Sequence, residues 1–456
     1  MSDHDNSLSE PVSVPLVTEP WGMMQTLQAV RQNVLSIIPQ IATKQPIVSG
    51  KMIKRWHMVT DPEALRRVML EKLDNYPKSE VTKNLLRPAI GESLFIAEGA
   101  HWRWQRRTVA PVFSQRNVLN LAPIMSAAAE RSALRLARYG TNRAINMFDE
   151  MITATFDVIA DVTFSGDGSF DRNAVHSVIE AYIGDAAKVS LFDMLALPNW
   201  IPRPGRILFG QGLKKTKGQA DRVIEERRKY HGNKIPDLLD LLLDGEDPKT
   251  KRKMNTAELR ENLLTFIVAG HETTALSLSW SLYLCAFDSN VQERAQTEAR
   301  AVLSDGRVAT GEDVARLPFI RQVIDEALRL YPPAGMVSRN AVARDELCGR
   351  TIRPGDIVIL PFYALHRNEL LWDHPNKFDP DRFADRKSIE RFSYLPFGDG
   401  PRICIGASFA LQEAVIILAT LLSRFRFTPI PGRDPKPVMI LTLRPEGGVW
   451  LKAEPV

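Results

Sequence analysis

The stretch PFGDGPRICIG, Pro396 to Gly406, places one cysteine in a loop crowded with glycine, and it decides how the rest of the sequence is interpreted. Cys404 stands two residues after Arg402 and directly before an apolar helical pattern, ASFALQEAVIILATLLSRF. Glycines let backbone N–H groups approach a sulfur closely, and a helix N-terminus beside an arginine favours a thiolate. The loop therefore predicts a thiolate that acts as a nucleophile, a redox sensor or an axial metal ligand.

The remaining cysteines narrow these roles. Cys285 and Cys348 lie far from Cys404 and no CxxC pair exists, so the sequence predicts neither a zinc or iron–sulfur cluster nor a disulfide framework. An odd number of well-separated cysteines fits a reducing cytosol. A nucleophile needs a base, usually histidine, and no signature of a cysteine hydrolase surrounds Cys404. A buried structural cysteine is the simplest alternative to a reactive one.

The composition is that of a soluble globular protein. Hydrophobic residues make up 44% and charged residues 25% of the 456 residues, and such a chain can bury a core and still enclose a ligand. The net charge of +5 is slight, and no block of like charge suggests nucleic acid. No stretch of about 18 apolar residues predicts a transmembrane anchor. The polar, proline-punctuated residues 1–20 predict a flexible arm rather than a signal peptide, so we expect a cytoplasmic protein.

Helical patterns dominate the chain, with a few strand-like pieces between them. The longest pattern is NTAELRENLLTFIVAGHETTALSLSWSLYLCAFD, in which Asn255 and Glu258 form a capping box. Thirty-odd helical residues would span roughly 45–50 Å, and the apolar middle predicts a central buried helix. We predict a mainly α fold with small β-sheets (α+β) in one large domain, residues 21–456. This domain also includes a further helical pattern at 173–188. A proline-broken connection at 190–210 follows it and is a candidate access lid.

The middle of the long helix carries AGHETT, Ala269 to Thr274. Ala269, Glu272 and Thr273 share one face at i, i+3 and i+4. An acid inside so apolar a helix is costly unless it serves a purpose. The Thr273 hydroxyl has a simpler interpretation, a bond to the carbonyl four residues earlier that bends the helix. The sequence thus combines a thiolate in a loop with an acid and a hydroxyl in a buried helix.

Three further patterns accompany the loop and the helix. Glu326 and Arg329 form E-x-x-R before LYPP, FDPDRF contains Arg382, and W-x-x-x-R joins Trp102 to Arg106. Alone, E-x-x-R is common as an exposed helix salt bridge, and a Trp–Arg pair is more often packing and surface charge. Their joint occurrence in one order carries more information than any single pattern.

Together these patterns resemble the cytochrome P-450 family. The loop matches F-x-x-G-x-R-x-C-x-G at Phe397, Gly400, Arg402, Cys404 and Gly406. AGHETT, E-x-x-R and FDPDRF precede it in the order of the family, and the resemblance runs from about residue 60 to the end. It implies the cytochrome P-450 fold, a single large domain in which haem lies between the long central helix and the cysteine-ligand loop.

The resemblance also implies roles for single residues. Cys404 would be the axial ligand of the iron of haem b. Glu272 and Thr273 would deliver protons to dioxygen. A structural network on the haem side of the core would join three residues, Glu326, Arg329 and Arg382.

Further positions are implied in binding. The residues expected around haem, chiefly as partners of its two propionates, are Trp102, Arg106, Ala269, Arg339, Phe397, Arg402 and Gly406. By analogy, the substrate pocket is lined by Phe266, Ala269, Met336, Val337 and Leu441. These pocket residues are apolar, so a hydrophobic substrate follows.

The resemblance implies a haem-thiolate monooxygenase that inserts one atom of O2 into a hydrophobic small molecule. A fatty acid is the first candidate substrate class and a terpenoid or aromatic compound the second. Electrons would come from a separate ferredoxin or flavodoxin, with Arg103 and Arg107 as candidate docking contacts, because no GxGxxG dinucleotide site is evident. The alternatives are a peroxide-driven peroxygenase, against which Glu272 and Thr273 argue, and a non-catalytic haem-thiolate sensor.

Overall fold

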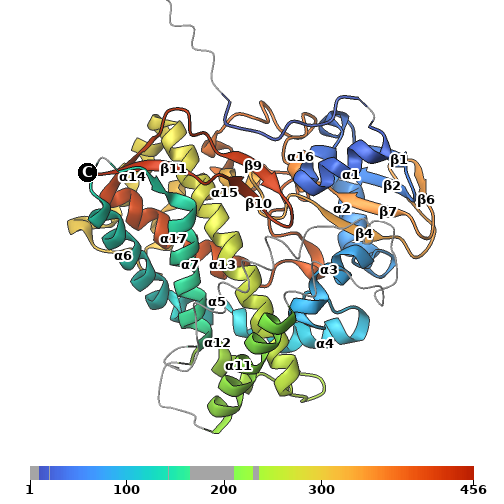
Figure 1. The fold of residues 1–456 in the computed structure, drawn as a ribbon, viewed down its shortest axis with the longest axis horizontal. Helices are drawn as coiled ribbons and strands as arrows, with labels where there is room; N and C mark the ends of the chain where they lie inside the picture. Colours follow the sequence, from blue (N-terminus) through green and yellow to red (C-terminus); the bar gives the residue numbers. More distant parts are fainter. Residues whose placement is uncertain (1–9, 20, 142, 165–209, 230–235) are drawn as a thin grey trace, which may run out of the picture.

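The long helix α13 (Thr256–Phe287) crosses the middle of the molecule, other helices pack along it, and a four-stranded sheet lies to one side (Figure 1). This computed structural model describes residues 10–19, 21–141, 143–164, 210–229 and 236–456. The expected fold class, mainly α with small β-sheets, is confirmed. The helical pattern at 173–188 and all but the last residue of the 190–210 connection lie outside the described residues.

The described helices alternate with short strands along the chain. Besides α13, the α-helices are α1 (Met23–Gln32), α2 (Pro62–Arg66), α3 (Glu80–Ile90), α4 (Gly99–Val109), α5 (Gln115–Asn120), α6 (Ala122–Tyr139), α7 (Met147–Phe164), α11 (Gly210–Lys229), α12 (Leu238–Asp244), α14 (Ser289–Val302), α15 (Pro318–Leu330), α16 (Phe362–Leu365) and α17 (Ala407–Arg424). The strands are β1 (Ile47–Lys51), β2 (Arg55–Val59), β3 (Ile145–Asn146), β4 (Val337–Asn340), β5 (Asp345–Leu347), β6 (Arg350–Ile352), β7 (Ile357–Leu360), β8 (Phe425–Pro429), β9 (Lys436–Met439), β10 (Leu443–Glu446) and β11 (Trp450–Pro455).

The strands form small sheets at the edge of the helical body. The largest has the order β1-β2-β7-β4, in which β2 and β7 are parallel and the other pairs are antiparallel. A second sheet has the order β3-β11-β8, and β9–β10 and β5–β6 form two-stranded sheets. Because β1 is an edge strand of the largest sheet, the β1–β2 hairpin lies at the surface.

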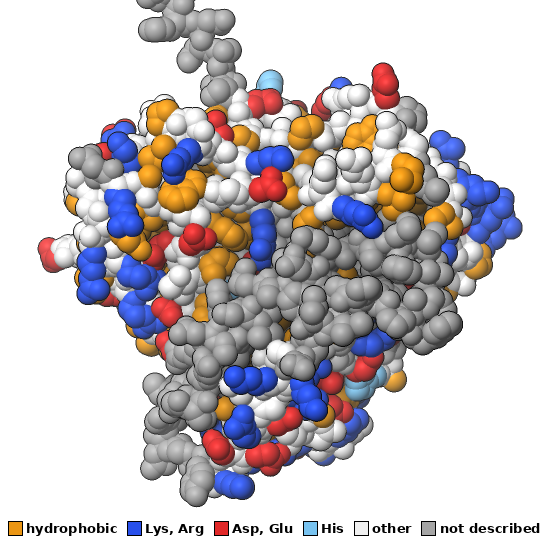
Figure 2. Space-filling model, viewed as in Figure 1, with side chains coloured by type: hydrophobic (Ala, Val, Ile, Leu, Met, Phe, Trp, Pro, Cys, Tyr) orange, Lys and Arg blue, Asp and Glu red, His pale blue; other side chains and the backbone are white. Residues whose placement is uncertain are grey.

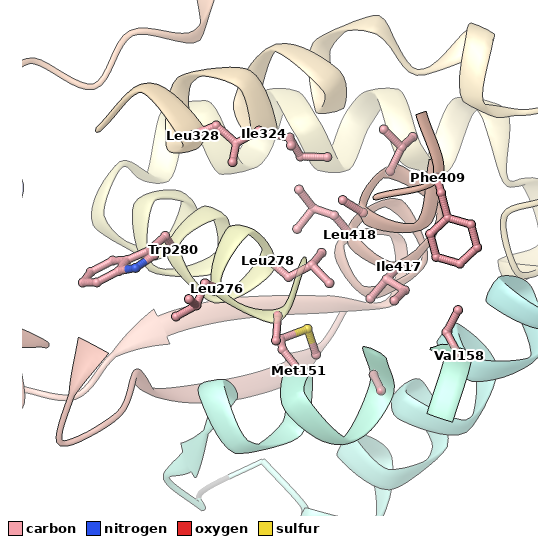
Figure 3. Close-up of a cluster of buried hydrophobic side chains, with 14 of the residues drawn as sticks. Met151, Val158, Leu276, Leu278, Trp280, Ile324, Leu328, Phe409, Ile417 and Leu418 are labelled. Atoms are coloured by element: carbon pink, nitrogen blue, oxygen red, sulfur yellow. The ribbon is translucent and has the colours of Figure 1, made fainter. Parts of the chain in front are cut away.

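Helix α13 begins where the sequence predicts it and is buried along most of its length. The Asn255 side chain accepts the Glu258 N–H at 2.9 Å, and Glu258 accepts the Asn255 N–H at 3.0 Å, so the capping box is confirmed. Figure 3 shows the interior, where Leu278 of α13, Met151 of α7 and Leu418 of α17 meet. Burial of each such side chain contributes roughly 1.5–3 kcal/mol, so this packing holds α13 in place.

Helix α17, which follows the cysteine loop, is a core helix. Among the described residues it is the one helix long and apolar enough to cross a membrane, and 72% of it is buried inside the molecule. It packs against α6, α13 and α14. Because α17 is fixed on several sides, the loop that precedes it is anchored at its C-terminal end.

Part of the segment expected to be a flexible arm is fixed to the helical body. The Val12 N–H donates to Tyr283 Oη at 3.1 Å, and the Val12 carbonyl accepts Tyr331 Oη at 2.6 Å. The N–H of Val14, whose side chain is buried, donates to Tyr363 Oη at 2.8 Å. Residues 10–19 thus differ from the expectation for 1–20 because buried tyrosine hydroxyls take the segment as their partner. Residues 1–9 and 20 lie outside the described residues.

Glu326 and Arg329 lie one turn apart on α15, and both are fully buried. Two guanidinium nitrogens bind the Glu326 carboxylate at 2.6 and 2.8 Å. The other N–H groups donate to the carbonyls of His366, Pro375 and Lys377. All five N–H donors of Arg329 are therefore used. Arg382 joins this network through a 3.4 Å contact with Glu326.

His366 connects this ion pair to the cysteine loop. Its side chain is fully buried, with Nδ1 3.2 Å from the Arg329 carbonyl oxygen. Its Nε2 accepts the N–H of Leu395 at 2.8 Å, and Leu395 directly precedes PFGDGPRICIG. A protonated ring would lose this acceptor. Burial, and then the charge of Arg329, lower the pKa of His366 to about 3.

We expect the variant His366→Gln to be less sensitive to acid than the wild type. A histidine with a pKa of about 3 when folded and 6.5 when unfolded stabilises the fold above pH 6.5, and this stability is lost as the pH falls toward 3. Between about pH 8 and about pH 5.5 the wild type should lose about 1.4 kcal/mol of unfolding free energy through this group, and His366→Gln none of it. Urea unfolding across this range measures the difference.

The matched control is His101→Gln, because His101 is exposed. It should keep the pH dependence of the wild type. Parallel curves for the wild type and His366→Gln would show that His366 is not held neutral by its surroundings.

Candidate functional site

The cysteine loop is held by a backbone hydrogen bond and by close packing at one glycine. The Cys404 N–H donates to the Phe397 carbonyl at 2.8 Å. Gly400 has a φ of +73°, which favours glycine, and a Cβ there would meet the Met69 carbonyl oxygen at 2.6 Å. Met69 belongs to a turn wound as a π-helix, Arg67–Glu71 (η3). The loop therefore rests on η3 and leads directly into α17.

The Cys404 side chain is exposed at the atomic surface, although much of the protein surrounds it. This enclosure has the larger effect and raises the pKa of the thiol, whereas the Gly406 N–H and the charge of Arg106 lower it. The loop sequence alone suggested Arg402 as the supporting charge, although the resemblance implies a propionate partner at that position. The structure assigns it to Arg106 because Arg402 is committed to other partners. A metal ion would supply the charge that a stable thiolate requires.

Ala269 and Thr273 form an open face in the middle of α13. Ala269 is exposed and Thr273 is half-buried, although the flanking turns of the helix are mostly buried. Thr273 Oγ1 donates to the Ala269 carbonyl at 2.7 Å, the helix-bending bond that the sequence left open. Because its proton is used, the hydroxyl presents lone pairs and can accept a hydrogen bond from a group in the open space.

Glu272 does not share this open face. Its side chain is buried, and Oε1 accepts Thr442 Oγ1 at 2.7 Å and Arg444 Nε at 2.5 Å. No hydrogen bond joins it to Thr273 within the described part of the chain. The expectation that Ala269, Glu272 and Thr273 act from one face is therefore wrong for Glu272. The reason is a long-range ion pair, which helical periodicity does not reveal.

Three basic side chains gather beside the loop with one carboxylate among them. Lys78 and Arg339 are antiparallel bridge partners, and Arg402 forms an ion pair with Glu98. Burial, Arg402 and Arg339 together hold the pKa of Lys78 far below its usual value. Burial and Arg402 lower the pKa of Arg339 to about 10. The group is therefore short of negative charge.

Lys78 and Glu98 were missed by the sequence analysis. Neither lies in a motif, and 300 or more residues separate Glu98 from Arg402 along the chain. The backbone N–H of Lys78 donates to Glu98 Oε1 at 2.9 Å, so Glu98 fixes both the lysine and the arginine. No local signal in the sequence marks either residue.

Trp102 and Arg106 of α4 take different partners. The Arg402 guanidinium lies 4.4 Å from the centre of the buried Trp102 ring, a cation–π contact. Arg106 is half-buried, and no hydrogen bond or ion pair to any described residue satisfies its guanidinium. Burial lowers the pKa of Arg106, and Cys404 opposes this shift. Arg106 thus lies near the Cys404 sulfur, and its guanidinium N–H groups are available to a ligand.

These residues fit a haem group. A thiol suits haem iron as an axial ligand, and cations short of carboxylates suit two propionates. Half-buried Gly406 adds space, because no described atom lies within 4 Å of a Cβ built there. The structure itself contains no ligand, so the fit rests on this set of side chains.

The expected pocket residues contact three clusters of apolar side chains. Leu441 and Val268 pack against both the main core and a small cluster that includes Leu86 and Ile90 of α3. Phe266 is buried instead against Phe113, with ring centres 5.3 Å apart. Met336 and Val337 are half-buried, at and just before the start of β4. The hydrophobic character expected of this region is present in all of them.

A central helix with an open face, a cysteine loop and cations suited to two carboxylates define a haem-thiolate protein. Comparison with known families agrees, and the chain belongs to the cytochrome P450 family, whose model, described as Cytochrome P450, matches residues 15–453. The fold and the family expected from the motifs are thereby confirmed. The protein is an oxidoreductase of the monooxygenase class.

The relatives cover most of the chain but differ in what their names say they act on. Cyclooctat-9-en-7-ol 5-monooxygenase of Streptomyces melanosporofaciens is 33% identical over 83% of this chain and 81% of its own. Cytochrome P450 4F3 of Homo sapiens is 31% identical over 88% of this chain and 82% of its own length. Cytokinin hydroxylase of Arabidopsis thaliana is 30% identical over 89% of this chain and 81% of its own length. The matches thus cover more than four-fifths of this chain, and the two names that specify a substrate specify different ones.

We expect Arg444→Gln to destabilise the protein by about 2 kcal/mol or more, because it leaves the buried Glu272 carboxylate without its cation. The double variant Arg444→Gln/Glu272→Gln should recover part of this loss. Urea unfolding of both single variants and the double variant gives the coupling energy.

The control is Lys436→Gln in the same β9–β10 hairpin, where Lys436 and Glu446 form an exposed ion pair at 3.1 Å. Its removal should change stability by less than about 1 kcal/mol. A coupling energy for Glu272 and Arg444 no larger than that of a surface pair would contradict the role assigned to Arg444.

Proposed function

We propose that this protein is a haem-thiolate monooxygenase that inserts one oxygen atom of O2 into a hydrophobic small molecule, with Cys404 as the axial ligand of haem b. The observation that carries the proposal is the accessible Cys404 thiol beside a cluster of cations short of carboxylates. We further propose that residues 21–456 form the catalytic domain of a cytoplasmic enzyme.

Haem would supply the chemistry of O2 activation, and the protein would hold it and control its surroundings. We assign the propionates to Arg106, Arg339 and Arg402, with Trp102 supporting Arg402. Lys78 joins them as a fourth cation. The loop residues Phe397 and Gly406 would pack on the thiolate side, and Ala269 would contact haem from α13. An alanine leaves room there that a larger side chain would fill.

Proton delivery would use Thr273 and Glu272 in different ways. The Thr273 hydroxyl lies on the open face and would accept a hydrogen bond from a water or an oxygen ligand there. The Glu272 carboxylate would first have to loosen its bonds to Thr442 and Arg444 before it passed a proton toward that face. Since Thr442 adjoins the pocket residue Leu441, a substrate that moves this segment would affect Glu272 directly.

The substrate would be a hydrophobic compound bound against Phe266, Ala269, Met336, Val337 and Leu441. A fatty acid remains a candidate class, as do terpenoids and aromatic compounds. One relative is named for hydroxylation of cyclooctat-9-en-7-ol and another for cytokinin. We therefore place cyclic alcohols beside fatty acids as the compounds to test.

The electron donor would be a separate ferredoxin or flavodoxin, and the structure suggests where it docks. Arg107 is tied to the buried Asp247 at 2.7 and 2.8 Å, and Arg103 pairs with Asp74. Lys72 and Arg344, by contrast, have no ion pair among the described residues, and they line one surface hollow together with Asp74 and Asp345, whose carboxylates pair with Arg103 and Arg67. Lys72 directly follows η3, which packs on the cysteine loop, so we replace Arg103 and Arg107 by Lys72 and Arg344 as the principal contacts.

The reduced carbon monoxide complex tests the haem-thiolate proposal. The wild type should give the strongly red-shifted band of thiolate ligation, and Cys404→Ser should lose it while keeping the helical circular dichroism of the wild type. Cys348→Ser, which removes the other exposed cysteine, should keep the band. A band in Cys404→Ser, or none in the wild type, would refute the assignment.

Binding of candidate substrates is measurable by the shift in haem spin state. We expect a fatty acid, a cyclic terpenoid alcohol or an aromatic compound to produce it, and Leu441→Ala to weaken binding about tenfold through lost apolar contact. Leu370→Ala, at an exposed leucine, should bind as the wild type does. Product formation that needs both O2 and reductant distinguishes a monooxygenase from a peroxygenase and from a sensor.

Salt should slow electron transfer from an acidic donor. We expect the rate of first reduction to fall about tenfold between about 50 mM and about 500 mM salt, and Lys72→Gln/Arg344→Gln to reduce it similarly at low salt. Stopped-flow reduction with an acidic ferredoxin measures both effects. Lys214→Gln, at an exposed lysine of α11, is the control. A rate independent of salt would reject this docking surface.

A further inference from the structure

The segment from Trp21 to Thr60 contains no aspartate or glutamate. It contains five basic residues, Arg31, Lys44, Lys51, Lys54 and Arg55. The whole chain has 59 Lys and Arg against 54 Asp and Glu, so the remaining residues carry 54 of each sign. The entire formal net charge of +5 therefore resides in this one segment, which we call the basic N-terminal segment.

Most cations of this segment are free to meet an external partner. Arg31, Lys51 and Lys54 are exposed, and none has an ion pair with a described residue. Lys44 forms an exposed pair with Glu369, which water and salt weaken. Arg55 is satisfied by Asp356 inside the fold. Three unpaired cations and one weakly paired lysine thus face the solvent.

The same segment exposes large apolar side chains. Of the thirteen large hydrophobic residues exposed in the described part of the chain, five belong to it: Trp21, Met24, Ile41, Met52 and Ile53. Met24 is 75% exposed and Ile53 is 52% exposed. Figure 2 shows hydrophobic side chains over the upper right of this face, where Figure 1 places α1, β1, β2 and β7, and Lys and Arg at the right edge, where Figure 1 places β6. Exposed apolar side chains concentrated in one part of a protein surface are typical of an interaction site.

The β1–β2 hairpin has a tip suited to a lipid surface. Its turn reads Lys51-Met52-Ile53-Lys54, and all four residues are exposed. Two apolar side chains can enter the headgroup region while the flanking lysines extend their ammonium groups toward lipid phosphates. Exposed apolar side chains flanked by lysines suit the boundary between lipid headgroups and acyl chains.

Helix α1 repeats this combination. Met24, Gln28 and Arg31 lie at i, i+4 and i+7, so they share one face, and all three are exposed. Trp21 is exposed just before the helix, and tryptophan favours the membrane–water interface. The helix and the hairpin tip therefore both offer apolar side chains with cations and no acids.

We propose that the basic N-terminal segment docks this protein peripherally on an anionic membrane surface, with Met52 and Ile53 inserted and Lys51, Lys54 and Arg31 paired to lipid phosphates. The proposal does not depend on the reaction or on haem. Each basic residue near such a surface favours binding about fivefold, and the apolar tip adds to this. No transmembrane helix is needed for contact of this kind.

Co-sedimentation of the full-length holoprotein with vesicles tests the proposal. We expect binding to phosphatidylcholine vesicles that contain about one-third phosphatidylglycerol, and at least about tenfold weaker binding to pure phosphatidylcholine. Met52→Ser/Ile53→Ser should weaken binding about tenfold or more, and Lys51→Gln/Lys54→Gln should weaken it at low salt and remove most of its salt dependence.

The control is Leu134→Ser, which removes a similarly exposed leucine from α6 and should bind as the wild type does. Two results would overturn the proposal. One is equal binding by the wild type and Met52→Ser/Ile53→Ser, or none by either. The other is sedimentation of the wild type as a dimer that Met52→Ser/Ile53→Ser converts to a monomer, because the apolar tip would then serve contact between two copies.

Discussion

The buried guanidinium of Arg329 is the constraint on which the rest of the haem side depends. An arginine removed from water must satisfy five N–H groups, and here Glu326 and three backbone carbonyls do so. Those carbonyls belong to a segment with little regular structure between α16 and the cysteine loop. The ion pair therefore fixes the backbone between α16 and the cysteine loop, which belongs to no sheet or long helix. Through His366 and the N–H of Leu395, that order reaches the loop that carries Cys404.

The site combines groups that are satisfied with groups that are not. All five N–H donors of Arg329 have partners, whereas Lys78, Arg339 and Arg402 have only the single carboxylate of Glu98 among them. Such a surplus costs free energy in the folded chain unless an anionic ligand removes it. A haem with two propionates would therefore stabilise the folded protein as well as supply its reactive group. Loss of the haem would leave three cations close together without enough negative charge to neutralise them.

The sequence predicted best what local chemistry decides. The capping box of α13, the placement of α17 after Cys404 and the class of fold were all correct, because each follows from residues close together in the chain. The partners of Glu272 were not predictable, since Thr442 and Arg444 lie 170 and 172 residues away. Lys78 and Glu98 belong to no motif, and the tyrosine partners of Val12 and Val14 lie 271 to 349 residues away along the chain. The loop alone suggested Arg402 as a charge beside the thiol, and the resemblance made it a partner of a haem propionate; its guanidinium contacts Glu98 and Trp102.

The hydrogen bonds that hold residues 10–19 have a consequence for synthesis of the chain. Val12 and Val14 precede their tyrosine partners by 271 to 349 residues, so they leave the ribosome well before those partners. At about 5–20 residues per second, the wait for Tyr363 is roughly 17–70 s. During that time Pro11 and Pro15, which fix φ and lack a backbone N–H, disfavour regular helix or sheet in the segment. Residues 10–19 thus reach their final position on the helical body only after translation has passed Tyr363.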